Sequence, residues 1–300
     1  MTLKQLEAFY WAATCSSFAL AAERVHLSVS SLSKRIAELE ASLGQTLFDR
    51  TGHRAALTEA GARLLPLAGA LLQQADQLQQ QMGSPTASLR GPCRLGVGEL
   101  TAMTWLPRLV AAIASAHPDL ELSVHVDVGA ALAERLDKGA LDVAVIAGPA
   151  SRTALTAVPI AQAAFTWCAR PEVAASVRSM NAAALQAHPL VALPPGSGVT
   201  QLIDDWLRQS GAQPVRRLHC NHWGAIAGLL AHSGGIGLLP QGWARALQRR
   251  DVLRQLKSPV PLGELGYGLH HRRDDLRPLV GALRALAARE ADFTVAGSVF

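Results

Sequence analysis

Residues 17–44 read SFALAAERVHLSVSSLSKRIAELEASLG, and this stretch decides the N-terminal fold. Apolar residues recur at helical spacing on both sides of a short turn at residues 26–28. Ser16 or Ser17 is placed to cap the first helix, Ser28 to cap the second, and Gly44 to end it. The pattern predicts two short helices joined by a tight turn, which is the helix-turn-helix arrangement.

The flanking residues complete a small domain. A first apolar stripe with helical spacing runs through Leu3, Leu6, Tyr10 and Ala13. Residues 47–57 place a glycine turn between two short extended pieces, which is typical of a β-wing. We therefore expect residues 1–58 to form an all-α winged helix-turn-helix domain.

The start of the second helix carries the predicted chemistry. With Leu32 facing inward, the outward residues can reach base edges through hydroxyls, a thymine methyl through Val29, and phosphates through Lys34. The alternative is a generic three-helix packing module whose wing arginines are only solvated charges. The candidate DNA-binding residues are Ser28, Val29, Ser30, Ser31, Ser33, Lys34, Arg50 and Arg54.

These motifs resemble those of LysR-type transcriptional regulators. Residues 17–23 resemble the family's SFxxAAExL entry, residues 32–44 its recognition helix, and residues 47–50 and 57–61 its wing and the helix that follows. The family usually has Gln after the capping serine, where this chain has Val29. Because Gln reads adenine bidentately and Val cannot, we expect a different base preference.

A long helix is predicted over residues 59–82, after a cap at Thr58. Leucines recur every seven residues, with mostly small residues four positions further on, and Pro66 interrupts the run. We interpret this seam as a dimerisation helix; the alternative is an amphipathic helix packed on its own domain. The resemblance implies a paired linker helix here, and residues 83–90 are predicted to form a hinge. The candidate pairing residues are Leu64, Ala68, Leu71, Ala75 and Leu78.

Residues 91–300 alternate strand and helix patterns, beginning with a strand over 93–98, a helix over 103–116 and a strand over 120–128. The order β-α-β-α-β predicts a parallel sheet, with ligands at the carboxyl ends of the strands. This half resembles the family's effector-binding domain, which is similar to periplasmic solute-binding proteins. The predicted class is thus α/β, two-lobed and periplasmic-binding-protein-like. Lobe 1 is expected over about 91–162 and 266–300, and lobe 2 over about 163–265.

Strand ends and helix starts supply the candidate effector site. Backbone N–H groups there could hold a carboxylate, and Glu99 could bind an amine or remain solvated. Trp223 could stack on an aromatic effector, or belong to the core as most tryptophans do. The candidate residues are Gly98, Glu99, Leu100, Thr101, Ser197, Gly198, His222 and Trp223.

Composition limits the class of protein. Hydrophobic residues form 49% of the 300-residue chain, which suits buried cores, but the longest strongly apolar run is nine residues. A membrane span needs about 20, and no export signal is seen, so we predict a cytoplasmic protein. The net charge is +5, yet residues 1–58 hold only six basic and five acidic side chains. The DNA-binding hypothesis therefore rests on local pattern rather than on charge.

The four cysteines form no CxxC pair. Their spacing argues against a zinc ribbon or a disulfide scaffold, and buried thiols are the simplest interpretation. A redox-sensing pair formed by Cys168 and Cys220 is the alternative.

Catalytic motifs are missing from the pattern. Ser197 lacks the GxSxG context, no Walker A sequence occurs, and His270 has no neighbours with metal-ligand spacing. We predict no enzyme activity, metal or cofactor, but a ligand-responsive transcription factor that binds double-stranded DNA as a homodimer, or as the homotetramer that the resemblance implies. RNA polymerase is a further candidate partner. The alternatives are a solute-binding receptor, which does not explain the helix-turn-helix, and a non-specific nucleoid protein.

Overall fold

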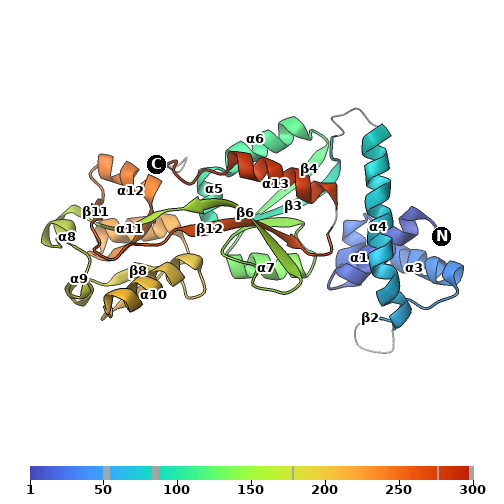
Figure 1. The fold of residues 1–300 in the computed structure, drawn as a ribbon, viewed down its shortest axis with the longest axis horizontal. Helices are drawn as coiled ribbons and strands as arrows, with labels where there is room; N and C mark the ends of the chain where they lie inside the picture. Colours follow the sequence, from blue (N-terminus) through green and yellow to red (C-terminus); the bar gives the residue numbers. More distant parts are fainter. Residues whose placement is uncertain (50–54, 83–87, 178, 276, 297–300) are drawn as a thin grey trace.

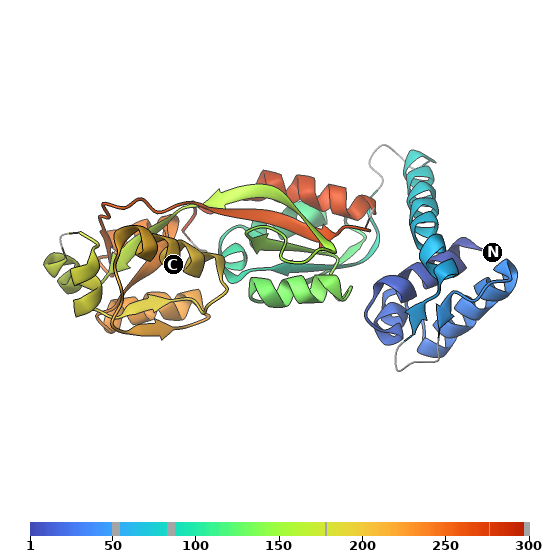
Figure 2. The same cartoon turned by 60° about the horizontal axis from the view of Figure 1, so that its bottom comes forward.

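The computed structural model describes residues 1–49, 55–82, 88–177, 179–275 and 277–296. Three bodies lie in a row: a helical N-terminal domain with the long helix α4, a central α/β lobe, and a distal α/β lobe (Figures 1 and 2). Within those residues, no helix is both long and apolar enough to cross a membrane.

Side-chain caps begin the first three helices. Ser17 Oγ accepts the Leu20 N–H and Ser28 Oγ accepts the Ser31 N–H, while Gly44 ends the third helix with a left-handed φ of 64°. These are the predicted caps, and the helix-turn-helix is confirmed. The helices are α1 (Leu3–Thr14), α2 (Phe18–Arg24) and α3 (Val29–Leu43).

The wing follows as a two-stranded antiparallel ribbon, β1 (Phe48–Asp49) and β2 (Ala56–Leu57). Phe48 packs on the rings of Phe9 and Phe18, which ties the wing to the core of the helices. The predicted wing arginines, Arg50 and Arg54, lie outside the described residues.

Helix α4 (Glu59–Met82) begins where Thr58 Oγ1 accepts the Gly61 N–H, as its predicted cap requires. Pro66 lies inside this helix, which continues beyond it. Because its first turns pack on α1, the helix is anchored to the N-terminal domain.

Lobe 1 is built on a five-stranded sheet of order β4-β3-β5-β12-β6. Helices α6 and α13 lie on one face and α7 on the other (Figure 1). Its strands are β3 (Gly91–Val97), β4 (Leu120–Val126), β5 (Val143–Ala147), β6 (Leu155–Ala163) and β12 (Leu265–Arg272), and its helices are α5 (Glu99–Thr104), α6 (Leu106–Ala116), α7 (Gly129–Asp137) and α13 (Pro278–Glu290).

Lobe 2 is built on a second five-stranded sheet, of order β11-β7-β10-β8-β9. The chain reaches it from β6 and returns through residues 257–264 to β12. Its strands are β7 (Phe165–Ala169), β8 (Leu190–Ala192), β9 (Arg217–His219), β10 (Ile236–Pro240) and β11 (Arg254–Leu256). Its helices are α8 (Pro171–Ser176), α9 (Ala182–Ala187), α10 (Gly198–Ser210), α11 (Trp223–His232) and α12 (Gln241–Arg249).

Two expectations about this half are corrected. The sheets are mixed rather than parallel, because β12 runs antiparallel to β5 and β6, and β7 runs antiparallel to β10 and β11. The helix expected over residues 103–116 belongs to two helices, which meet at the fully buried Trp105. The two-lobed α/β class itself is confirmed.

Candidate DNA interface and effector site

The N-terminal turn of α3 is an exposed, hydroxyl-rich surface. Ser28, Ser30 and Ser31 are exposed, and their hydroxyl oxygens lie 2.9 Å apart across the Ser28–Ser30 and Ser28–Ser31 pairs. Val29 is 46% exposed beside them. Hydroxyls can donate to phosphates and base edges, and the free N–H groups of a helix start favour anions.

The opposite face of α3 holds this surface in place. Leu32, Ile36 and Leu39 are fully buried against α1 and α2. Lys34 is exposed next to the serine turn, whereas Ser33 is half-buried. The helix therefore presents its polar start outward from an apolar base, as DNA reading by a helix-turn-helix requires.

The predicted seam on α4 divides between two faces. Ala68 is fully buried in the core of the N-terminal domain, so it is not presented to a partner, and Leu64 is half-buried against the same core. Leu71 is 41% exposed, and Leu67, one turn earlier, is 61% exposed. Ala75 is half-buried, and the Leu78 side chain lies outside the described part. The heptad spacing did not predict Leu67. Because Leu67 is exposed next to Leu71, we add it to the candidate pairing face.

The junction between the lobes brings Glu99 and the start of α11 together. Both Glu99 carboxylate oxygens accept the Trp223 N–H, at 2.9 and 3.0 Å. His222 Nδ1 accepts the Ala225 N–H, so Nε2 carries the proton in the neutral ring and faces Glu99 Oε1 at 3.4 Å. A carboxylate from lobe 1 thus occupies the N-terminus of a lobe 2 helix.

The start of α10 also meets lobe 1. A Cβ at Gly198 would lie 2.8 Å from Leu265 Cδ1 and 3.4 Å from Ala147 Cβ, so only glycine allows this approach without a shift. Ser197 Oγ accepts the Thr200 N–H at 3.1 Å, which makes Ser197 a helix cap.

Three of the predicted effector residues are core residues. Leu100 is 2% exposed and Thr101 is fully buried, because α5 turns both toward the interior of lobe 1. Trp223 is 4% exposed and stacks on Phe165 with ring centroids 5.9 Å apart. Of the two interpretations of Trp223, the structure therefore supports the core.

A cavity of about 270 Å³ lies on lobe 2 beside β7 and β11. Its lining includes Trp167, Gln241 and the segment 260–264, and it includes none of the predicted effector residues.

Buried thiols are poor nucleophiles in this chain. Burial raises the pKa of Cys15, and it raises the pKa of Cys93 to about 12. Burial also raises the pKa of Cys168, while Cys220 is half-exposed. Among the described residues, no group of His, Cys, Asp and Glu is arranged to hold a metal ion.

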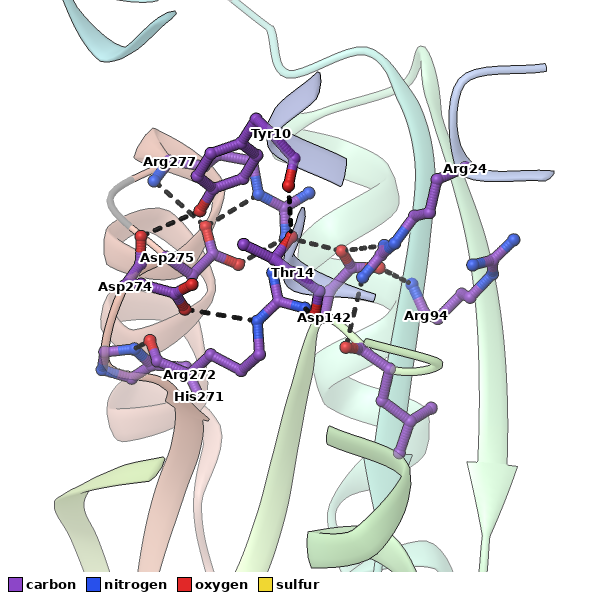
Figure 3. Close-up of polar contacts among 11 residues, drawn as sticks. Tyr10, Thr14, Arg24, Arg94, Asp142, His271, Arg272, Asp274, Asp275 and Arg277 are labelled. Atoms are coloured by element: carbon purple, nitrogen blue, oxygen red, sulfur yellow. Dashed lines mark hydrogen bonds and ion pairs between the residues drawn. The ribbon is translucent and has the colours of Figure 1, made fainter. Parts of the chain in front are cut away.

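A charged cluster joins the N-terminal domain to lobe 1, and the spacing of residues did not predict it (Figure 3). Asp142 accepts from Arg24 of α2 and, at 2.6 Å, from Arg277 at the start of α13. Burial alone would raise the pKa of Asp142, but Arg277 and Arg24 hold that pKa below its usual value. Arg24 and Arg277 are 118 and 135 residues away from Asp142 in the sequence, so no local sequence pattern could predict these pairs.

A winged helix-turn-helix with an exposed recognition turn, followed by a long helix and two α/β lobes, defines a DNA-binding regulator with a ligand-binding domain. Family models agree: residues 3–62 match a bacterial regulatory helix-turn-helix protein, lysR family, and residues 86–292 match the LysR substrate binding domain. The chain belongs to the LysR family of transcriptional regulators.

Relatives support this membership over the whole chain. A probable hydrogen peroxide-inducible genes activator of Mycobacterium avium is 33% identical over 299 residues, which are 96% of this chain and 95% of the relative. A full-length OxyR variant of Pseudomonas aeruginosa shares the fold with a TM-score of 0.66 at 20% identity, over 98% of this chain and 96% of the other. CbnR complexed with its target DNA shares the fold with a TM-score of 0.54 at 20% identity. The match covers 97% of this chain and 100% of the CbnR chain. A solute-binding receptor and a nucleoid protein are not favoured, since each accounts for only one of the two matched domains.

Proposed function

We propose that the chain reads its operator with the N-terminal turn of α3, residues 28–34, while the wing contacts the DNA backbone. The observation that carries this proposal is the exposed serine turn with Lys34 above a fully buried apolar face. Serine hydroxyls and the helix start bind phosphates and base edges, and Val29 contacts a thymine methyl. The predicted contacts of Arg50 and Arg54 remain part of this proposal.

Pairing through α4 supplies a second recognition helix, which binds the second half-site of the DNA. The face formed by Leu67 and Leu71 is apolar and exposed in the single chain, and a second copy of the same helix covers it in our proposal. The mutual burial of leucines explains why this surface can remain apolar. Two recognition helices then lie about 34–36 Å apart, which is one turn of DNA.

Lys34→Ala tests the phosphate role of this residue. We expect weaker binding to all duplexes alike, and a slope of log affinity against log salt that is shallower by about 0.9. Fluorescence anisotropy over a salt series measures both effects. A loss confined to one duplex sequence would contradict a phosphate contact.

For the effector site, we propose that a small carboxylate competes with Glu99 for the start of α11. Glu99 shows that the Trp223 N–H can donate to a carboxylate, and this bond joins the two lobes. An effector that takes its place replaces a link between the lobes and so favours another arrangement of them. This role differs from the amine binding predicted for Glu99. His222, whose Nε2 lies 3.4 Å from Glu99 Oε1, would lie beside the competing carboxylate.

Glu99→Gln tests this competition. The amide is a weaker acceptor, so acetate or benzoate is expected to raise the Tm of the variant more than that of the wild type. A gain of 1 kcal/mol corresponds to roughly 2–4 °C in a domain of this size. Differential scanning fluorimetry with chloride-matched controls gives the comparison. A larger rise for wild type, or stabilisation by amines alone, would refute carboxylate competition.

The name of the Mycobacterium avium relative suggests peroxide as a signal. We infer that this chain does not read peroxide through Cys93 or Cys168, because the reactive form of a cysteine is the thiolate and burial disfavours it in both. Cys220 is the one half-exposed thiol among the four, so the alternative of a redox-sensing Cys168–Cys220 pair would have to act through Cys220 first.

Thiol labelling tests the exposure argument. At pH 8 we expect iodoacetamide to modify Cys220 at least about tenfold faster than Cys15, Cys93 or Cys168, since alkylation needs an accessible thiolate. Peptide mass spectrometry of the folded chain over time gives the four rates, and urea-unfolded chain is the control in which the rates converge. If Cys168 were labelled as fast as Cys220 in the folded chain, Cys168 would not be buried as described.

A further inference from the structure

The N-terminal domain and the effector domain have separate apolar cores. In the described residues, the core of the first domain is drawn from residues 6–72 and the cores of the second from residues 89–293, with no shared member. Each domain therefore buries its own apolar surface, and their junction has to be explained by other contacts. Those contacts are mostly charged and hydrogen-bonded (Figure 3).

Ion pairs cross this junction from both domains, since Arg24 of α2 pairs with Asp142 and Arg94 of β3 pairs with Glu23 of α2. On lobe 1, Asp142 and Asp275 pair with Arg277, and Asp274 pairs with Arg272. Arg24 of α2 adds a guanidinium to this set from the N-terminal domain. The Arg24 and Asp142 side chains are 3% and 0% exposed in the docked state, so each neutralises the other where water is excluded.

Trp11 of α1 packs against three guanidinium groups of the junction. The guanidinium carbons of Arg24, Arg277 and Arg272 lie 4.4, 4.8 and 5.4 Å from its ring centroid, within cation–π range. Trp11 itself is 6% exposed. An indole at this place shields the ion pairs from water on the side of the N-terminal domain.

Direct hydrogen bonds fix the orientation of the two domains. The Tyr10 hydroxyl donates to the Asp274 carbonyl at 2.8 Å, and the Ser16 N–H donates to the Lys138 carbonyl at 3.1 Å. Arg272 also donates to the Thr14 carbonyl at 3.2 Å. Tyr10 and Thr14 lie in the C-terminal half of α1 and Ser16 follows its end, so these bonds hold that end of the helix against lobe 1.

We propose that this junction is a reversible latch: α1 and α2 dock on lobe 1 through Arg24, Asp142 and Trp11, so that each DNA-binding domain moves as one unit with lobe 1. Charged faces hydrate well when they separate, and Arg24 Nε and Arg272 Nη2 lack a hydrogen-bond partner within the described part of the chain. The docked state leaves the serine turn of α3 exposed, so docking and DNA binding are compatible. Only this last point rests on the proposed function.

A disulfide across the junction tests docking directly. A Cβ added at Gly139 of lobe 1 would lie 2.9 Å from the Sγ of Cys15 in the N-terminal domain, a separation that suits a disulfide. Gly139→Cys treated with oxidised glutathione, which takes up the two electrons and two protons, should form an intramolecular link to Cys15. We expect more than half of the chains to link, as measured by peptide mapping; failure to link in a folded variant would overturn the proposal.

The glycine substitution needs its own controls. Gly139 has a φ of 71° and the new Cβ would approach Arg272 Nη1 at 2.6 Å, so some strain is expected. Gly139→Ala carries the same strain without a thiol, and the double variant Cys15→Ser, Gly139→Cys lacks the partner thiol. Neither should form the link.

Asp142→Asn tests the latch without touching the glycine. Loss of the carboxylate charge should release Arg24, and hydrogen exchange at the Ser16 N–H should accelerate at least tenfold while amides of β3 and β5 remain protected. Glu23→Gln is the matched control, because its ion pair with Arg94 lies at the same junction but the Glu23 side chain is 67% exposed. Unchanged exchange at Ser16 in Asp142→Asn would overturn the proposal.

The DNA measurement separates this latch from the proposed function. The probe is a duplex selected in vitro from a random library by the full chain. We expect linked Gly139→Cys to bind it within threefold of its reduced form; a loss of tenfold or more, reversed by reductant, would overturn compatible docking. If wild type selects no duplex, the proposed function fails, while the linking and exchange results still decide whether the domains dock.

Discussion

Ser30→Glu is expected to lower affinity for duplex DNA by about 100-fold or more and to leave the fold intact. The new carboxylate would face phosphates from the exposed turn of α3, and like charges brought together at an interface cost several kcal/mol. In the free protein, a negative charge in the first turn of a helix is favourable, so the Tm should stay the same or rise. Electrophoretic mobility shift and thermal unfolding measure the two effects.

Ala41→Glu is the matched control, since Ala41 is exposed on the same helix, about 16 Å further along its axis. It adds the same charge away from the serine turn. Equal losses in both variants would show that the net charge of the domain, rather than the turn at residues 28–34, governs binding.

Leu71→Asp is expected to turn the paired protein into chains that no longer associate through α4. In the pair, an aspartate in the leucine face of each helix would be buried without a partner. A single chain binds DNA with one domain instead of two linked ones, which lowers the affinity by roughly 100-fold or more. Multi-angle light scattering gives the mass, and the same mobility shift gives the affinity.

Ala62→Asp serves as the control for this variant. It lies nine residues earlier on α4, half a turn around the helix, and is also exposed. Its assembly should remain that of wild type. If Leu71→Asp also kept the wild-type mass, α4 would not be the pairing element.

Local chemistry made much of the N-terminal domain predictable. Ser17, Ser28 and Thr58 cap helices as expected, because a cap depends on residues three positions apart and is visible in the sequence. The alternation of α and β patterns likewise predicted two α/β lobes. Strands β6 and β12 were not predicted, so the sheet was expected to be parallel rather than mixed. The direction of β12 depends on how the chain returns from lobe 2, which the sequence does not show.

Side-chain roles set by distant partners were harder to predict. Glu99 was a candidate for the effector site, yet its bond to the Trp223 N–H joins residues 124 positions apart and changes its role from free ligand to helix cap. Ala68 fits the heptad pattern but packs on its own domain, because the direction of α4 relative to α1 decides which face is covered. The Arg24–Asp142 pair had no sequence signal at all.

Hydroxyl-radical footprinting of the selected duplex tests the central claim most directly. Wild type should protect two patches about one helical turn apart, and Ser30→Glu at the same protein concentration should protect neither. If Ser30→Glu left the same two patches protected, DNA would be held by some other surface than the start of α3.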